Sequence, residues 1–158
     1  MPSARIREHA APALRGAGDL RKRFLAGLPF APTHAQARVA AEVARDLGKP
    51  APMLRLVQGD VGSGKTVVAA LAALAAVESG IQAALMAPTE LLAEQHYRNF
   101  QRWMEPLGIE VVWLAGKLKG RVRSAGAACS RMRARKRLRL RCWASSSLYS
   151  LISASLFG

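Results

Sequence analysis

Acidic residues are absent from this sequence after Glu110, although the chain continues to Gly158. Residues 121–158 hold nine Lys and Arg side chains and no acid, whereas residues 1–120 carry a surplus of only five positive charges. A block of like charge favours contact with polyanions such as nucleic acids, and the more balanced part is typical of an ordinary globular domain. The formal net charge of +14 therefore comes mostly from residues 121–158 and is not spread evenly over the chain.

Cysteine and long hydrophobic runs are also scarce. The two cysteines, Cys129 and Cys142, have no His or Cys neighbours at ligand spacing, so they predict neither a zinc site nor a disulfide framework. The longest apolar stretch, residues 67–77, is about half of the roughly 20 residues that cross a bilayer. No N-terminal apolar region of a signal peptide is visible. The sequence predicts a cytoplasmic protein without a membrane partner.

Eight residues, 59–66, have the pattern G-x-x-x-x-G-K-T directly after the apolar run 53–58. Glycines allow the backbone to adopt positive φ and to bring its N–H groups close to an anion, and a following helix adds the positive end of its dipole. In such a loop Lys65 reaches the β- and γ-phosphates, and the Thr66 hydroxyl helps to hold Mg²⁺. The alternative is a glycine-rich turn in a domain that binds no nucleotide.

Hydrophobic patterning predicts strands that alternate with helices. Thr33 and Gln36 have the spacing of a capping box at the start of the first long helix, and residues 19–25 predict two turns of helix before it. The expected elements are helix 34–47, strand 53–58, helix 65–79, strand 83–87, helix 90–104 and strand 110–114. This order predicts an α/β fold with a parallel sheet, followed after residue 120 by an irregular basic tail.

Three further clusters suggest ligand contacts. Phe30 and Gln36, upstream of the loop, are suited to stack on adenine and to hydrogen-bond it, or else they are only a hydrophobic staple and a helix cap. Thr89 follows a strand end, where helix N–H groups can hold a nucleic-acid phosphate, although taken alone it is better explained as an ordinary N-cap after a proline. Gly116 and Lys117 suit a phosphate contact or a solvated turn.

Together these motifs resemble the N-terminal half of the motor in RecG-type ATP-dependent DNA helicases of superfamily 2. The resemblance covers residues 28–120 and rests on residues 28–36, 53–66, 86–96 and 118–120. It implies an incomplete RecA-like P-loop domain that takes ATP and Mg²⁺, from a parent that remodels branched DNA in repair and recombination. His34 departs from the small residue that is common at its position.

The resemblance also assigns roles to single residues. Phe30 and Gln36 recognise adenine, and Lys65 and Thr66 are catalytic, with Thr66 also holding the metal ion. The ATP phosphates are held by Gly59, Asp60, Val61, Gly62, Ser63, Gly64, Lys65 and Thr66. The residues expected to contact DNA are Thr89, Glu90, Gly116 and Lys117.

The main departure from the family is a missing acidic motif. The family continues with D-E-x-H, which positions Mg²⁺ and water, and no acid follows Glu110 here. We therefore expect a linker at 1–27, a partial helicase ATP-binding domain at 28–120 that binds Mg·ATP weakly without turnover, and an aberrant or disordered basic tail at 121–158. That tail is either the product of a reading-frame change or a designed or natural basic extension. A non-enzymatic nucleic-acid binder is the alternative function, and a small P-loop kinase is disfavoured by the helicase-like clusters.

Overall fold

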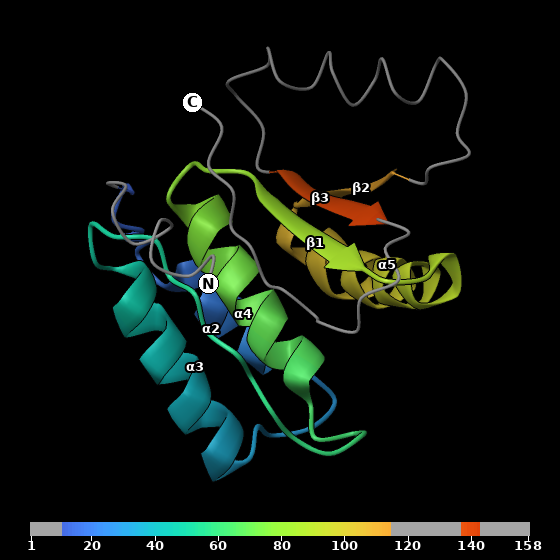
Figure 1. The fold of residues 1–158 in the computed structure, drawn as a ribbon, viewed down its shortest axis with the longest axis horizontal. Helices are drawn as coiled ribbons and strands as arrows, with labels where there is room; N and C mark the ends of the chain where they lie inside the picture. Colours follow the sequence, from blue (N-terminus) through green and yellow to red (C-terminus); the bar gives the residue numbers. More distant parts are fainter. Residues whose placement is uncertain (1–10, 115–136, 143–158) are drawn as a thin grey trace, which may run out of the picture.

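The computed structural model describes residues 11–114 and 137–142 of the chain, as helices packed on a parallel sheet (Figure 1). The predicted α/β class is confirmed. Four of the expected helices and two of the expected strands form within a residue of their predicted bounds. The elements in chain order are α2 (Asp19–Ala26), α3 (His34–Leu47), α4 (Lys65–Glu78), β1 (Ala83–Ala87), α5 (Glu90–Met104), the 3-10 helix η1 (Glu105–Leu107), β2 (Glu110–Leu114) and β3 (Arg137–Cys142).

The sheet has the strand order β1-β3-β2, with both neighbouring pairs parallel. Strand β3 lies between the other two, so Leu138 pairs with Ala83 on one side and with Val111 on the other. The sequence analysis predicted irregular structure after residue 120, and this was wrong for Arg137–Cys142. Arginine alternates with leucine there, which is the period-two pattern of a strand. The rest of residues 121–158 lies outside the described residues.

Of two hydrophobic clusters, the smaller packs α3 on α4 and the larger joins α2, α4 and α5 to the sheet. Phe100 of α5, Leu74 of α4 and Met104 are its largest fully buried side chains. Leu20 and Phe24 of α2 are buried in the same cluster, and the ring of Phe24 meets Trp103 edge-on at 5.9 Å. Thus α2, which lies in the stretch predicted as a linker, packs as part of the core. None of the described helices combines the length and hydropathy needed to cross a membrane.

Helix α2 is fixed to the far end of α4 by a carboxylate. The backbone N–H groups of Gly18 and Leu20 donate to Oε2 and Oε1 of Glu78 over 3.1 Å and 2.6 Å. A side chain at Gly16 would collide with Glu78, so glycine is needed for this approach. A carboxylate at a helix N-terminus satisfies donors that have no partner within the helix and interacts favourably with the helix dipole. The contact explains why so short a helix is held in place.

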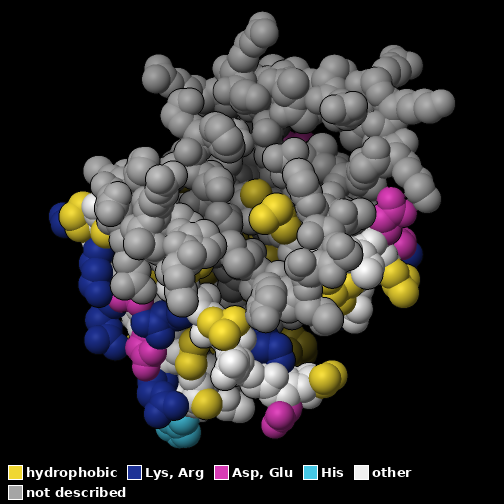
Figure 2. Space-filling view, viewed as in Figure 1, with side chains coloured by type: hydrophobic (Ala, Val, Ile, Leu, Met, Phe, Trp, Pro, Cys, Tyr) yellow, Lys and Arg dark blue, Asp and Glu magenta, His cyan; other side chains and the backbone are white. Residues whose placement is uncertain are grey.

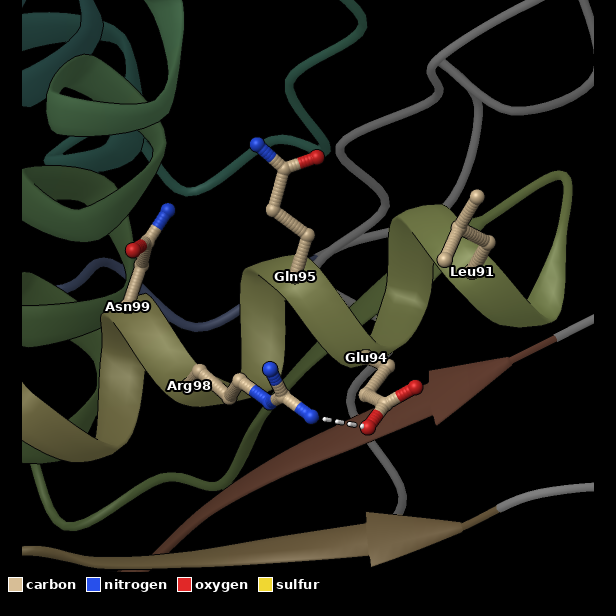
Figure 3. A pocket seen from close by; sticks show the side chains of 5 residues that line it. All are labelled: Leu91, Glu94, Gln95, Arg98 and Asn99. Carbon is tan, nitrogen blue, oxygen red and sulfur yellow. Dashed lines mark hydrogen bonds and ion pairs between the residues drawn. The ribbon is translucent and has the colours of Figure 1, made fainter.

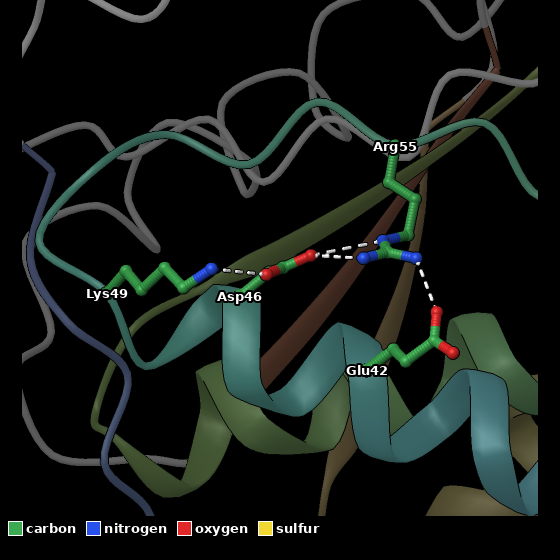
Figure 4. A network of polar contacts seen from close by, with 4 residues as sticks. All are labelled: Glu42, Asp46, Lys49 and Arg55. Atoms are coloured by element: carbon green, nitrogen blue, oxygen red, sulfur yellow. Dashed lines mark hydrogen bonds and ion pairs between the residues drawn. The ribbon is translucent and has the colours of Figure 1, made fainter.

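The predicted strand 53–58 is the main error of the sequence analysis. These residues belong to no strand, although Leu54 and Leu56 are more exposed than their neighbours in the alternating manner of one. Arg55 instead bonds this segment to α3, where its guanidinium donates to Asp46 and Glu42 (Figure 4). The segment is held on a helix rather than hydrogen-bonded into the sheet.

Candidate phosphate-binding site

The loop 59–64 connects the extended segment to α4 and is exposed over most of its length. It closes with a turn in which the N–H of Ser63 donates to the carbonyl of Asp60 over 3.1 Å. Gly62 and Gly64 have φ values of +83° and +79°, which residues with a Cβ adopt only with strain. Gly59 lies so close to Ser63 that a Cβ there would approach its Oγ to 2.7 Å. The glycines of the motif are therefore required by the backbone path itself.

The start of α4 presents unpaired donors next to this loop. Among the described residues, the backbone N–H groups of Gly62, Gly64, Lys65 and Thr66 have no protein acceptor. Unsatisfied N–H groups and the positive end of the helix dipole favour an anion at this point. Thr66, in the first turn of α4, is half-buried, whereas Val61 at the loop tip is fully exposed.

Lys65 folds back over the loop. Its Nζ donates to the carbonyls of Gly59 and Asp60 over 2.6 Å and 2.7 Å and lies 3.4 Å from Oγ of Ser63. The ammonium group is exposed and lies against the glycine-rich loop. A positive charge thus lies on the same loop as the free N–H groups, an arrangement that suits a multiply charged anion.

Gln36 is the upstream residue that the structure joins to the loop. Its Nε2 donates to the carbonyl of Ser63 over 2.8 Å, while its Oε1 accepts from the N–H of Thr33 over 2.9 Å. Thr33 Oγ1 in turn accepts from the N–H of Gln36, which completes the predicted capping box of α3. The amide also lies against Gly64, where a Cβ would overlap Nε2. Phe30, by contrast, lies in the segment before α3 with 46% of its surface exposed.

The residues predicted to contact DNA lie at a different place. Thr89 and Glu90 are exposed between β1 and α5, where Thr89 Oγ1 accepts from the N–H of Leu92 over 3.2 Å as an N-cap. Strand β1 runs opposite to α4, so the end of β1 and the start of α4 lie toward the same end of the sheet (Figure 1). Gly116 and Lys117 lie outside the described residues.

A hollow on α5 was not expected from the sequence. Its lining side chains all come from one helix: Leu91, Glu94, Gln95, Arg98 and Asn99 (Figure 3). Glu94 and Arg98 form an ion pair there at 2.6 Å, one turn apart, and Leu91 is 78% exposed. Among the described residues no second element lines the hollow, so they do not converge there on one ligand.

His96 is the one described residue with a buried side-chain nitrogen, Nδ1, that has no partner. It lies on α5 within the resemblance motif 86–96. Burial lowers its pKa, because the charged imidazolium loses hydration there. The ring is therefore neutral at neutral pH.

A cluster of charged residues that was not expected from the sequence lies around the extended segment before the phosphate loop. Glu42, Asp46 and Lys49 on or beside α3 and Arg55 in the extended segment form one polar cluster (Figure 4). The signal was present, since Glu42 and Asp46 are spaced i,i+4 and so share a helix face. In the space-filling view, basic and acidic side chains alternate over the side of the molecule where α3 lies (Figure 2).

Comparison with known proteins identifies the family. The family model described as DEAD/DEAH box helicase matches residues 32–133. The ATP-dependent DNA helicase RecG of Pasteurella multocida (strain Pm70) is 70% identical over 105 residues, which are 66% of this chain and 15% of that protein. RecG of Escherichia coli (strain K12) is 65% identical over 119 residues, 75% of this chain and 17% of that protein.

A solved structure of RecG bound to a three-way DNA junction shares the fold. It superposes with a TM-score of 0.78 at 37% identity, covering 85% of this chain and 18% of that one. This chain thus spans only 15% to 17% of the length of the two RecG relatives. The predicted resemblance is confirmed: the chain belongs to the DEAD/DEAH box helicase family, in which its sequence and its partial RecA-like α/β fold place it with the RecG helicases.

Proposed function

We propose that residues 59–66 bind the phosphates of ATP. The observation that carries this proposal is the position of Lys65, whose Nζ lies over a loop with free N–H groups at the start of α4. The roles of Gly59, Asp60, Val61, Gly62, Ser63 and Gly64 in this proposal are to shape the loop and to supply these donors. A triphosphate fits the charge and the concavity of such a loop better than a singly charged anion does.

The remaining parts of the nucleotide are assigned to neighbouring side chains. We assign Thr66 to Mg²⁺, which binds through phosphates and few protein ligands, so one hydroxyl at this point is sufficient. Gln36 and Phe30 are assigned to adenine. The Gln36 amide bonds Ser63 through one N–H and Thr33 through one lone pair, which leaves a second N–H and a second lone pair for adenine.

Hydrolysis needs more than this cradle. Phosphoryl transfer to water requires a group that positions the metal and the nucleophile, besides the lysine and the hydroxyl. No acid follows Glu110, so the acidic D-E-x-H motif is not among these residues. We propose that the 158 residues alone bind Mg·ATP without appreciable turnover, and that Lys65 and Thr66 act in catalysis only in the longer RecG-type motor.

DNA is the proposed second partner. Thr89 and Glu90 at the start of α5, together with Gly116 and Lys117, are the residues that we assign to it. RecG relatives are ATP-dependent DNA helicases, and the solved relative is bound to a three-way junction, which favours branched DNA for the parent. The alternative is non-specific binding of nucleic acid by the nine basic residues of 121–158. The RecG relatives come from bacteria, in which ATP and chromosomal DNA are both in the cytoplasm. We propose a cytoplasmic location for this chain as well.

A titration with fluorescent ADP and Mg²⁺ tests the nucleotide proposal. We expect saturable binding by the wild-type chain, loss of binding in Lys65→Met, and unchanged binding in the control Lys22→Met, an exposed lysine of α2. Equal binding by the wild type and Lys65→Met would refute it. Phosphate release that is stimulated by DNA and lost in Lys65→Met would contradict the absence of turnover.

Anisotropy with a labelled three-way junction at several salt concentrations tests the DNA proposal. A weaker affinity in Thr89→Ala at every salt concentration supports the contact at α5. An affinity that depends only on neutralising Arg131, Arg133 and Arg135 supports the basic-tail alternative instead, with a correspondingly reduced salt slope.

A further inference from the structure

Arg55 reaches from the extended segment before the phosphate loop to two carboxylates on α3. Its Nε and Nη2 donate to Oδ2 of Asp46 over 3.1 Å and 2.5 Å, and its Nη1 donates to Oε2 of Glu42 over 2.8 Å. The three side chains are between a quarter and a third exposed. Charge-assisted bonds from a guanidinium fork fix direction as well as distance, so the segment has a defined position at this residue (Figure 4).

This anchor matters because the segment has no other regular support. Residues 53–58 are not hydrogen-bonded into the sheet, and Leu54 and Leu56 are exposed. Apart from Arg55, Met53 holds it through packing against the cluster of Val43, Leu47 and Val68. Apolar packing at one residue sets no orientation, whereas the fork does.

The same helix also touches the loop at its other end. Gln36 in the first turn of α3 donates to the carbonyl of Ser63, while Asp46 near the end of α3 accepts from Arg55. The two contacts lie ten residues apart on the helix, which corresponds to about 15 Å. The chain from Arg55 to Ser63 thus runs antiparallel to α3 and is hydrogen-bonded to it on both sides of Gly59. Helix α3 therefore contacts the chain before and after Gly59 and holds it in place.

We propose that Arg55, through Asp46 and Glu42, is a positioning residue for nucleotide binding: it holds the chain that leads into the phosphate loop so that the loop keeps its binding conformation. This inference rests on the proposed function. Arg55 itself touches no ligand in this proposal. When the anchor is lost, the loop populates other conformations, and the apparent dissociation constant rises by the inverse of the fraction that stays competent.

The experiment compares two variants of the same carboxylate cluster in the full chain. Arg55→Met removes the anchor and keeps the aliphatic stem. Lys49→Met is the matched control, because Lys49 pairs with the same Asp46 at 2.8 Å without reaching the loop segment. Titration with fluorescent ADP and Mg²⁺ is performed well below the melting temperature of both. We expect a rise of about tenfold in the dissociation constant for Arg55→Met, and less than about twofold for Lys49→Met.

Conservative variants separate positioning from mere stabilisation. Arg55→Lys keeps the charge but cannot bridge both carboxylates, so we expect an intermediate dissociation constant. Glu42→Gln, which leaves the Asp46 bonds in place, serves if Arg55→Met does not fold, with an expected rise of about threefold. Hydrogen exchange should accelerate in residues 53–64 of Arg55→Met while α5 stays protected.

The outcomes distinguish this inference from the proposal on which it rests. Wild-type binding with equal affinities in Arg55→Met and Lys49→Met overturns the positioning role and leaves the nucleotide site intact. Equal losses of affinity in both variants also overturn it, because the effect then comes from removing a partner of Asp46 and not from releasing the segment that leads into the loop. No binding by the wild type overturns both proposals.

Discussion

Replacing Gly64 with alanine tests how tightly the phosphate loop is built against α3. Gly64 has a φ of +79°, and a Cβ at this position would overlap Nε2 of Gln36. Two costs therefore add. One is backbone strain in the left-handed region, and the other is displacement of the Gln36 amide from its bonds to Ser63 and Thr33.

The magnitude follows from these two contributions. A residue with a Cβ in the left-handed region costs roughly 1–2 kcal/mol. Each of the two hydrogen bonds of the displaced amide contributes roughly 0.5–1.5 kcal/mol to the free energy of unfolding. Gly64→Ala should therefore lower the free energy of unfolding by about 2–5 kcal/mol, a large part of the stability of a typical small domain.

Gly62→Ala is the matched control for this prediction. Gly62 has nearly the same backbone angle, φ +83°, but nothing lies within 4 Å of a Cβ placed there. Urea unfolding followed by circular dichroism should thus show only the strain of roughly 1–2 kcal/mol. In a Gln36→Ala background, Gly64→Ala should fall to the same value. An equal loss in Gly62→Ala and Gly64→Ala, or no coupling with Gln36, would refute this reasoning.

Two further predictions concern carboxylates. Glu78→Gln turns an amide NH₂ group toward one of the two backbone donors at the start of α2, and should lower the free energy of unfolding by about 1–3 kcal/mol; an unchanged urea midpoint would contradict the clamp. Hydrogen bonds from Lys49 and then Arg55 lower the pKa of Asp46 from 3.8 to about 2. Because its folded pKa lies below the unfolded value, its stabilisation is complete above pH 3.8 and is lost as the pH falls toward 2. Unfolding curves from pH 5 to 2.5 should show that the stability advantage of the wild type over Asp46→Asn shrinks in this window, and a constant difference would exclude the ion pairs as its origin.

The sequence predicted best where the determinants are local. Thr33 and Thr89 are the N-caps of helices α3 and α5. Their hydroxyls accept from the N–H three residues later, as the sequence indicated. Gly64 likewise marked the start of α4 through its left-handed backbone. Capping and glycine conformation involve neighbours within three or four residues, so a linear pattern is sufficient to reveal them.

The errors arose where a distant partner decides. Arg55 interrupts an apolar run, and the sequence alone does not reveal that its partners are Asp46 and Glu42 on another element. The helix over residues 19–25 was predicted as such, but its polar composition placed it in a linker, and the burial of Leu20 and Phe24 depends on distant residues such as Phe100. Composition and periodicity carry no information on which distant residue a side chain meets.

The apolar character of α4 explains why such distant contacts decide the geometry of the loop. Seven of its residues are buried and lie on several sides of the helix: Val67, Val68, Ala69, Ala70, Leu74, Ala76 and Val77. A helix that is apolar on most sides is enclosed by its neighbours, here α2, α3, β1 and β3. Its first-turn N–H groups are consequently fixed by the core. The glycine-rich segment before them has no such enclosure, so its position depends on the bonds of Gln36 and Arg55 along α3 and on the bonds of Lys65 to the loop. Besides Lys65 itself, Gln36 and Arg55 should therefore be the residues whose replacement changes nucleotide affinity.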